Sequence, residues 1–266
     1  MKDFKGKVAV VTGAASGIGR ALAFDFARRG MMIVAADIES APLERLKAEL
    51  APTGAPCLTL RTDVTQLEQV QALADAAFRE FGAVHVLCNN AGVAVSGPMA
   101  EASHTDWQWV LGVNLWGVIH GIEAFLPRMI AGKQGGHIVN TASMAGLIAS
   151  KDLGVYNTSK YAVVGLSETL VKEVKEHGIG VAVICPMGVR TGITESARNR
   201  PKEMANKKGP DIGLPLVGDY LQPEEVSRRA LAAIESGEFY VFTHPEAAEF
   251  IERRFERIRK TYQAFR

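Results

Sequence analysis

Tyr156 and Lys160 are the residues whose types and spacing could perform acid–base chemistry. They lie at the two ends of the segment 156–160 (YNTSK), so a helix would place both on one face. A phenol normally ionises near pH 10, and lowering that pKa by about three units requires roughly 4 kcal/mol. One cation about 5 Å away contributes roughly 3 kcal/mol at an effective dielectric of about 20. Lys160 could therefore bring Tyr156 close to a working general base, although both residue types are also common on helix surfaces.

A glycine-rich turn follows the first strand-like run of the chain. Residues 12–19 read TGAASGIG, and Gly13, Gly17 and Gly19 precede a helix-forming stretch. Such glycines allow a tight turn, and a diphosphate can then approach the backbone beside the positive end of the helix. Strand, turn and helix follow one another as in a dinucleotide-binding fold. We therefore expect this turn, with Ser16 and Ile18, to bind the diphosphate of a cofactor.

Asp37 ends the second strand-like run, eighteen residues after Gly19. A carboxylate at this place can accept hydrogen bonds from the adenosine ribose hydroxyls. It would repel the 2′-phosphate of NADP, and neither Ser16 nor Ile38 offers a positive charge to hold one. The sequence therefore favours NAD over NADP. The alternative, that Asp37 only caps a turn, stays open.

The composition is that of a globular chain and argues against several classes of function. Of 266 residues, 47% are hydrophobic and 22% are charged, and the formal net charge is +1. So balanced a charge gives no support to nucleic-acid binding. No eighteen apolar residues run uninterrupted, which argues against a membrane span, and the N-terminal residues lack the apolar core of a signal peptide. We therefore expect a cytoplasmic protein that binds neither nucleic acid nor membrane.

Disulfides and metals are not indicated by the cysteines and histidines. An odd, scattered set makes a poor disulfide framework, so Cys57, Cys88 and Cys185 are expected to be buried, reduced thiols. The six histidines show no metal-ligand spacing, and no pair of cysteines has the separation of a zinc site. We expect no metal.

Short β-branched runs alternate with longer helical patterns along the chain. The strand-like runs are almost continuously apolar, as in parallel strands buried on both faces. Strands are predicted over 7–12, 32–36, 57–61, 84–88, 137–141, 180–184 and 239–243, and helices over 18–29, 42–50, 67–81, 105–130, 155–176 and 223–236. The alternation predicts an α/β fold with a single doubly wound (Rossmann) parallel sheet of about seven strands and helices on both faces. No linker divides the chain, so one domain over residues 1–266 is predicted.

Two segments depart from this alternation. Residues 187–221 are interrupted by prolines and glycines, and a long irregular segment inside a compact domain is commonly a lid. We therefore expect a substrate lid at about 187–221. A C-terminal helix is predicted at about 245–266 and is expected to pack on its own core or on a neighbouring subunit. The apolar residues at helical spacing on it are Ile251, Phe255, Ile258 and Tyr262.

Taken together, these motifs make the chain similar to the short-chain dehydrogenase/reductase family. The resemblance also rests on residues 89–92 (NNAG) after the fourth strand, on Asn114, and on Ser143, thirteen residues before Tyr156; it covers residues 6 to about 190. It implies a single-domain, nicotinamide-dependent oxidoreductase. Residues 109–115 (WVLGVNL) and 195–198 (ESAR) also resemble the branch that includes lignin-fragment Cα-dehydrogenases.

The resemblance implies cofactor contacts at particular positions. Asp63 and Val64 would hold the adenine. Residues 89–92 would support the sheet and touch the cofactor, which involves Asn90, Ala91 and Gly92. The residues expected beside the nicotinamide are Pro186, Gly188, Val189 and Thr191, with Thr191 at the carboxamide. Met187 stands where the family usually has glycine, so this loop could have a different shape.

The same resemblance implies interconversion of an alcohol and a ketone by hydride transfer. Tyr156 would be the general acid/base, Lys160 would lower its pKa and bind the nicotinamide ribose, and Ser143 would hydrogen-bond the substrate oxygen. The ring of the oxidised cofactor would supply a second positive charge. Asn114 would hold a water that links Lys160 to solvent; alternatively, Asn114 bonds the backbone of its own helix.

The expected pocket is mainly apolar and lies between residues 93–97, residues 144–155 and the lid. Its apolar members are Val93, Val95, Met144, Leu147, Ile148, Leu153 and Met187. A hydrophobic secondary alcohol or ketone therefore suits it better than a charged sugar. The alternative, that several of these apolar residues belong only to the core, stays open.

Two other functions remain open from the sequence alone, because fold does not decide function. One is a non-catalytic nicotinamide-binding regulator, which would need no acid/base set. The other is a nucleotide-sugar isomerase or dehydratase, against which the glycine spacing and the lack of a large C-terminal substrate domain argue. A homodimer or homotetramer is expected, as is usual in the family, with helices near Trp109 and Trp116 and after Val155 as candidate faces.

Overall fold

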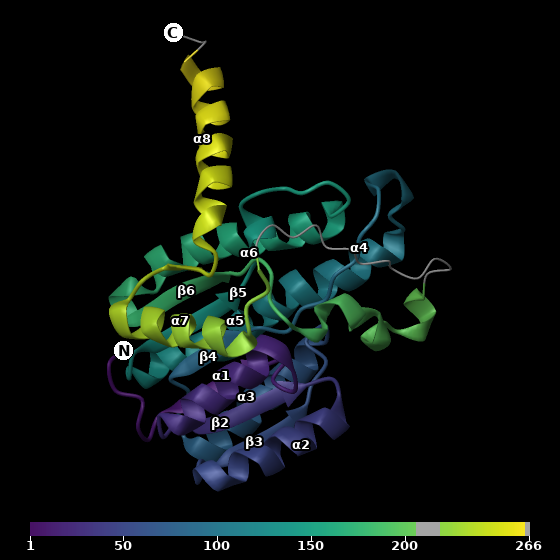
Figure 1. Ribbon diagram of the computed structural model, residues 1–266. Helices are drawn as coiled ribbons and strands as arrows, with labels where there is room; N and C mark the ends of the chain where they lie inside the picture. Colours follow the sequence, from purple (N-terminus) through teal and green to yellow (C-terminus); the bar gives the residue numbers. More distant parts are fainter. Residues whose placement is uncertain (206–218, 264–266) are drawn as a thin grey trace.

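In a computed structural model the chain forms a seven-stranded sheet between two layers of helices (Figure 1). The structure describes residues 1–205 and 219–263. The strands are β1 (Val8–Thr12), β2 (Met32–Asp37), β3 (Cys57–Arg61), β4 (Val86–Asn89), β5 (Gly136–Thr141), β6 (Ile179–Cys185) and β7 (Tyr240–Phe242). They lie in the order β3-β2-β1-β4-β5-β6-β7, and every neighbouring pair is parallel. The predicted doubly wound α/β fold is confirmed.

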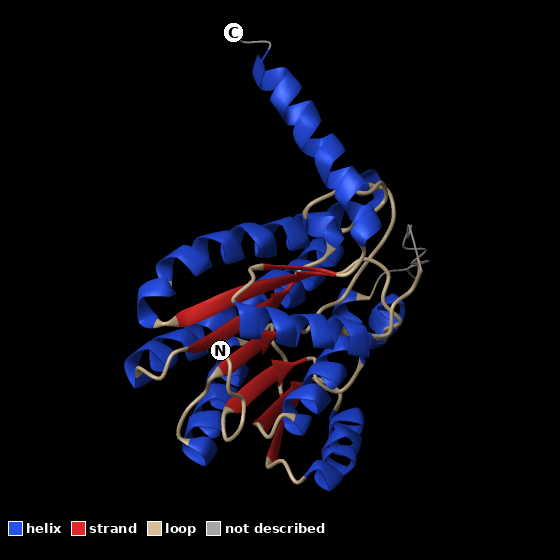
Figure 2. Ribbon diagram, turned by 60° about the vertical axis from the view of Figure 1, so that its left-hand side comes forward, coloured by secondary structure: helices blue, strands red, loops and turns tan. Residues whose placement is uncertain are grey.

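The helices divide between the two faces of the sheet (Figure 2). They are α1 (Gly17–Arg28), α2 (Ser40–Leu50), α3 (Leu67–Phe81), α4 (His104–Leu111), α5 (Gly117–Gly132), α6 (Gly154–Glu173), α7 (Pro223–Ser236) and α8 (Ala248–Gln263). Successive strand residues point to opposite faces, so Ala9 and Val11 pack beneath α1, α2 and α7, whereas Val8 and Val10 pack beneath α3, α5 and α6. This two-sided burial explains why the strands are apolar at nearly every position.

The helix predicted over 105–130 is continuous but contains a wider turn. Residues Gly112–Trp116 form a π-helical turn between α4 and α5. Such turns are frequent at functional sites, and this one carries the fully buried Asn114. Within the described part of the chain, His104–Gly132 is the one helix long and apolar enough to cross a membrane, a test that core helices also pass. Here it packs against α3 and α6.

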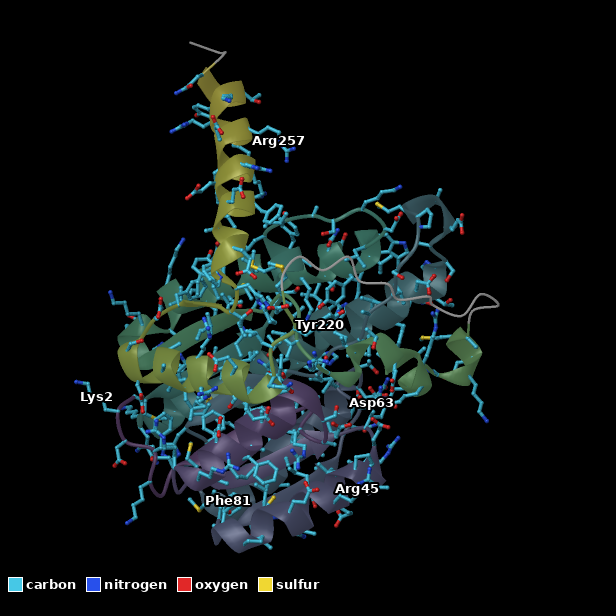
Figure 3. The ribbon with its side chains drawn as sticks, in the orientation of Figure 1. Lys2, Arg45, Asp63, Phe81, Tyr220 and Arg257 are labelled. Carbon is cyan, nitrogen blue, oxygen red and sulfur yellow. The ribbon has the colours of Figure 1, made fainter. Side chains whose placement is uncertain are left out.

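The C-terminal helix was expected to pack, through four apolar residues, on the core of its own chain or on a neighbouring subunit. For the core of its own chain the expectation is mostly wrong. Only Ile251, near its start, packs against the buried cluster under β6. Phe255, Ile258 and Tyr262 are about half exposed or more, and α8 extends away from the body. Arg257 lies well clear of the sheet and its helices (Figure 3). Residues 264–266 of the predicted helix lie outside the described residues. Packing on a neighbouring subunit remains a prediction.

The cysteines are free thiols, as expected from their number and spacing. Cys88 and Cys185 are buried, whereas Cys57 is partly exposed. Burial raises the pKa of each thiol, that of Cys57 to about 11. All three thiols are therefore protonated near neutral pH.

Candidate active site

The predicted site residues gather at the carboxyl ends of β1, β4 and β5. Strand order reverses between β1 and β4, and ligands of open α/β sheets bind in the crevice outside this point. A cavity of about 1260 Å³ lies there. Of the predicted catalytic and cofactor-binding residues, all but Gly19, Asn114 and Gly188 line it. Residues far apart in the sequence thus meet in one place.

The glycine turn between β1 and α1 is shaped by close backbone approach. Gly13 and Gly17 have left-handed φ angles of 64° and 52°. A Cβ on Gly13 would come within 2.9 Å of the Ala91 Cα, and one on Gly19 within 2.1 Å of the Gly13 carbonyl oxygen. α1 begins at Gly17 without a side-chain cap, so N–H groups of its first turn are available to an anion. The turn therefore fits the diphosphate of a dinucleotide.

Asp37, at the end of β2, faces this turn. Its carboxylate accepts the N–H of Ala15 at 2.9 Å and the N–H of Glu39 at 3.0 Å. Burial raises its pKa above 3.8, and the two backbone hydrogen bonds act against that rise. Each carboxylate oxygen has a second lone pair, so the same group can also accept a ribose hydroxyl. Turn capping and ribose binding are therefore compatible roles for Asp37.

The predicted adenine residues follow β3. Asp63 accepts hydrogen bonds from the N–H and hydroxyl of Thr65, at 3.0 Å and 2.8 Å. The Val64 carbonyl oxygen lies 2.8 Å from Nδ1 of His120, and the His120 ring packs on Trp116. His120 and Trp116 also line the cavity. Neither was assigned to the site from sequence, because a histidine and a tryptophan on one helix are equally typical of core packing.

Residues 89–92 begin at the last residue of β4 and contact the glycine turn. Their predicted contact with the cofactor stays a prediction. The Asn90 amide donates to the Thr12 carbonyl oxygen at 3.0 Å, and the Thr12 hydroxyl accepts the Asn90 N–H at 2.9 Å. A Cβ on Gly92 would lie 3.5 Å from the Asn114 oxygen and 3.6 Å from the Lys160 nitrogen. Glycine at position 92 therefore leaves room beside the Lys160 ammonium.

Tyr156 and Lys160 lie on α6 as predicted, and both are buried. Lys160 Nζ is 5.6 Å from the centre of the Tyr156 ring and donates to the Thr141 carbonyl oxygen at 2.9 Å. Ser143 follows β5; its hydroxyl accepts the Ala145 N–H at 3.1 Å and donates to the Pro186 carbonyl oxygen at 3.3 Å. Three of the four predicted catalytic side chains thus line the same cavity.

Burial in this part of the cavity opposes the ionisation of Tyr156 and the protonation of Lys160. Burial raises the pKa of Tyr156 to about 12, and a hydrogen bond with Ser143 acts in the opposite direction. Burial also lowers the pKa of Lys160 to about 8. Removal from water disfavours the charged form of both groups. The expectation that Lys160 lowers the pKa of Tyr156 only part of the way, with the cofactor ring as a second positive charge, stays a prediction. Further positive charge is needed beside the phenol.

Asn114 connects the π-helical turn to Val93 and to Ser159 on α6. Its oxygen accepts the Val93 N–H at 2.8 Å, and its amide donates to the Val93 carbonyl oxygen at 2.9 Å and to Ser159 Oγ at 3.0 Å. Ser159 in turn donates to the Tyr156 carbonyl oxygen at 2.7 Å. The alternative that Asn114 bonds its own helix backbone is wrong. Its predicted role in holding a water stays a prediction.

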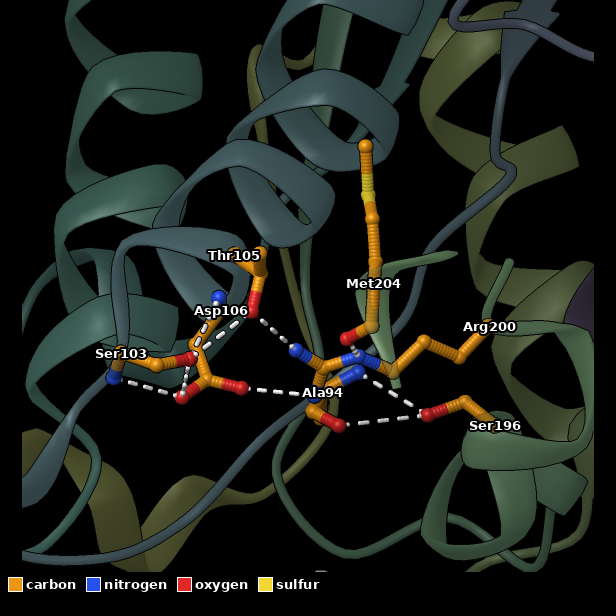
Figure 4. Close-up of polar contacts among 7 residues, drawn as sticks. All are labelled: Ala94, Ser103, Thr105, Asp106, Ser196, Arg200 and Met204. Atoms are coloured by element: carbon orange, nitrogen blue, oxygen red, sulfur yellow. Dashed lines mark hydrogen bonds and ion pairs between the residues drawn. The ribbon is translucent and has the colours of Figure 1, made fainter. Parts of the chain in front are cut away.

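The described part of the predicted lid is ordered by side-chain contacts (Figure 4). It contains two 3-10 segments, η6 (Gly192–Asn199) and η7 (Lys202–Met204). The Ser196 hydroxyl accepts the Ala94 N–H at 3.1 Å. Arg200 donates to Asp106 at 2.6 Å, to Thr105 at 3.2 Å and to the Met204 carbonyl oxygen at 2.6 Å. Residues 206–218 of the predicted lid lie outside the described residues.

Sequence reasoning missed the Arg200–Asp106 ion pair. The segment 103–106 (SHTD) has the spacing of a capping box, and Ser103 and Asp106 do form one at the start of α4. That pattern could have located Asp106 as the partner of Ser103. Nothing in the nearby sequence indicates that Asp106 also pairs with Arg200.

The apolar wall is largely as predicted. Val93, Met144, Ile148, Leu153 and Met187 line the cavity. Val95 and Leu147 do not line it and pack into buried clusters, which is the alternative that the sequence left open for some of these residues. Trp109 and Met204 line the cavity as well and extend its apolar surface. The Met187 N–H donates to Thr243 Oγ1 at 3.3 Å, which ties this loop to the end of β7.

Comparison with known proteins decides the family. A family model described as short chain dehydrogenase matches residues 7–202. The chain belongs to the short-chain dehydrogenase family. The resemblance deduced from the motifs is thereby confirmed, and the chain is an oxidoreductase of this family.

Relatives of this short-chain dehydrogenase match it over most of its length. It is 34% identical to a "C alpha-dehydrogenase" of Sphingobium sp. over 97% of this chain and 87% of the relative. It is 38% identical to the "D-threitol dehydrogenase" of Mycolicibacterium smegmatis over 86% of each chain. A short-chain dehydrogenase/reductase of Burkholderia phymatum, solved in complex with NAD, superposes with a TM-score of 0.93 at 42% identity, covering 98% of this chain and 97% of the other.

Proposed function

We propose that this short-chain dehydrogenase is an NAD-dependent enzyme that interconverts a hydrophobic secondary alcohol and its ketone, with Tyr156 as general acid/base. The observation that carries the proposal is the meeting of Ser143, Tyr156 and Lys160 at one wall of the cavity that also contains the glycine turn. A protein that only bound a nucleotide would have no use for a buried phenol and ammonium at that wall.

The proposed chemistry divides between cofactor and side chains. When bound, an oxidised nicotinamide would supply the hydride acceptor and a positive charge beside the phenol. Tyr156 takes the proton from the substrate hydroxyl in oxidation and returns it in reduction. Ser143 donates to the substrate oxygen, because its bond to the Pro186 carbonyl oxygen is long, at 3.3 Å, and can be exchanged. Lys160, fixed by the Thr141 carbonyl oxygen, holds positive charge near Tyr156 and binds the nicotinamide ribose.

The preference for NAD rests on Asp37 and its surroundings. Asp37 lines the cavity beside the glycine turn with its carboxylate held by backbone N–H groups, whereas the neighbouring Glu39 is paired with Arg198. The negative charge at the adenosine end is therefore that of Asp37. A 2′-phosphate would be repelled by this charge, whereas ribose hydroxyls can donate to it. The NAD bound in the Burkholderia phymatum relative is consistent with this preference.

The substrate class rests on the apolar wall, because the names of the relatives cover different alcohols. Val93, Met144, Leu153 and Met187 line the cavity that also contains Tyr156, and Trp109 of α4 adds to the same lining. Burying the apolar surface of a substrate there is favourable by about 25 cal/mol per Å². An aryl or alkyl secondary alcohol therefore gains more from this pocket than a polyol does.

A screen of alcohols and ketones, followed by NADH absorbance in both directions, tests the proposal. We expect turnover of aryl or alkyl secondary alcohols with NAD, and a lower kcat/KM with NADP. Turnover only of polyols would contradict the substrate class, and a preference for NADP would contradict the cofactor. Binding of NADH without turnover of any alcohol would favour a non-catalytic regulator.

We also propose that the enzyme is a homodimer or homotetramer. Trp116 on the π-helical turn and Phe255, Ile258 and Tyr262 on α8 expose large apolar surfaces. Apolar surface of this kind commonly marks an interface. Light scattering coupled to gel filtration should give two or four times the chain mass, and a monomer would contradict the proposal.

A further inference from the structure

Residues 191–204 form a strap across the candidate cofactor cavity. Thr191 lies against the glycine turn, because a Cβ on Gly17 would come within 3.0 Å of its Cγ2 atom. Further along, Arg198 reaches the connection between β2 and α2, and Arg200 reaches α4. The strap therefore crosses from the wall that carries Asp37 to the opposite wall.

The two arginines fasten the strap in different ways. Arg200 donates through all three guanidinium nitrogens, and the Arg200 and Asp106 side chains are only 7% and 9% exposed. Arg198 contacts Glu39 with Nη2 at 3.0 Å and Nε at 3.4 Å, but these side chains are 37% and 27% exposed. Exposed ion pairs hold weakly, whereas separating a buried pair leaves a charge without water or partner. The strap is thus anchored at Arg200 and releasable at Arg198.

The releasable end lies where a dinucleotide has to pass. Glu39 follows Asp37 by two residues, and its N–H donates to the Asp37 carboxylate. The Asn199 amide also donates to Glu39, at 3.3 Å, so two strap residues converge on one carboxylate. Arg198 donates as well to the carbonyl oxygens of Gly192 and Glu195, which keeps its guanidinium directed along the strap. Asp37, Glu39, Tyr156 and Arg198 line one cavity, so a molecule that spans it from Asp37 to Tyr156 shares it with this ion pair.

We propose that Glu39 and Arg198 are positioning residues that control exchange of the dinucleotide: their ion pair closes the strap over the bound cofactor, and its separation lets the cofactor leave. The inference rests on the proposed function, because it requires a nicotinamide dinucleotide in this cavity. Its specific content is that one exposed ion pair sets the release rate, while the Arg200–Asp106 pair stays intact.

The Glu39→Gln variant distinguishes closure from simple electrostatics. Removing a carboxylate beside an anionic dinucleotide would by itself strengthen binding and slow release. Loss of the closure acts in the opposite direction and speeds release. The sign of the change is therefore diagnostic, and a role in folding alone would not produce it.

The experiment measures NADH release by stopped-flow fluorescence, with excess NAD as displacing ligand, at low and high sodium chloride. We expect Glu39→Gln to release NADH about two- to fivefold faster than the unmodified enzyme at low salt, the range for an exposed ion pair. Salt should speed release from the unmodified enzyme more than from the variant. The double variant Glu39→Gln/Arg198→Gln should be no faster than the faster single variant, because both remove the same contact.

Glu235→Gln is the matched control. Glu235 pairs with Arg29 at 2.8 Å on the surface between α7 and α1, away from the cavity, with similar exposure. This variant should release NADH at the unmodified rate. Equal or slower release from Glu39→Gln would overturn the inference; slower release would show that the dinucleotide competes with Glu39 for Arg198. If the unmodified enzyme does not bind NADH at all, the proposed function fails, and this inference fails with it.

Discussion

Lys160 Nζ lies 5.6 Å from the centre of the Tyr156 ring while it donates a 2.9 Å hydrogen bond to the carbonyl oxygen of Thr141. A backbone group at the end of β5 therefore holds the ammonium one helical turn from the phenol. Burial raises the pKa of Tyr156 to about 12 and lowers that of Lys160 to about 8. The protein maintains this arrangement at a cost in stability, which can be measured.

Replacing Lys160 by methionine should stabilise the fold while abolishing turnover. Because burial lowers the pKa from 10.5 to about 8, the charged form costs at most about 3 kcal/mol at pH 7. Between about pH 8 and 10.5 the unfolded chain binds more protons, so the unmodified enzyme gains stability as the pH rises. Urea unfolding should show that Lys160→Met has the larger free energy of unfolding at pH 7, and that this difference is smaller at pH 10. This expectation would be contradicted if Lys160→Met were less stable and if its difference in free energy of unfolding from the unmodified enzyme were the same at both pH values.

Replacing Asp37 by asparagine should shift cofactor preference toward NADP. The amide keeps one oxygen for the Ala15 N–H, but the charge facing a 2′-phosphate is lost. The NADP-to-NAD ratio of kcat/KM should rise by about tenfold or more, which corresponds to about 1.4 kcal/mol of relieved repulsion. Asp25→Asn is the control, since Asp25 pairs with Arg28 on α1. An unchanged ratio in Asp37→Asn would show that Asp37 does not face the ribose.

Replacing Arg200 by lysine should loosen the strap. A lysine ammonium cannot reproduce the planar contacts to Asp106, Thr105 and the Met204 carbonyl oxygen. We expect a loss of about 2 kcal/mol or more in the free energy of unfolding, and a KM for substrate that rises more than kcat falls. Arg128→Lys, in an exposed pair with Asp75, should cost less than about 1 kcal/mol. Equal losses in the two variants would remove the special role of Arg200.

Replacing either of two helical glycines by alanine should change the stability of the protein, in opposite directions at the two positions. A Cβ on Gly121 would come within 2.0 Å of the Asn89 oxygen, whose side chain is fixed by Asn140. Nothing lies within 4 Å of the same position on Gly165 in α6. Gly165→Ala should stabilise by up to about 1 kcal/mol, and Gly121→Ala should destabilise by about 1–3 kcal/mol. Thermal unfolding of the two variants checks the signs, and stabilisation by Gly121→Ala would refute the close approach.

How much could be predicted from sequence depended on whether the signal was local. Apolar runs and helical spacing located every strand, and the bounds of α3 and α7 match the predicted helices. The catalytic set was predictable because Tyr156 and Lys160 share one helix. The pairs Asp106–Arg200 and Glu39–Arg198 were not, since 94 and 159 residues separate the partners and neither partner's type reveals the other.

Two further features depended on tertiary context rather than on pattern. The π-helical turn at Gly112–Trp116 leaves no mark in the spacing of apolar residues, so the sequence suggested an uninterrupted α-helix. The direction of the pKa shift at Tyr156 depends on burial of the side chain, which the Tyr-x-x-x-Lys spacing does not encode.

The central claim, that the Tyr156 hydroxyl transfers the substrate proton, is tested most directly by the Tyr156→Phe variant. Steady-state oxidation of the best alcohol from the screen is measured beside a fluorescence titration of NADH. Turnover should fall by about 10²-fold or more, the usual contribution of one acid/base group, while NADH affinity stays within about threefold. Turnover close to that of the unmodified enzyme, with NADH still bound, would contradict the claim.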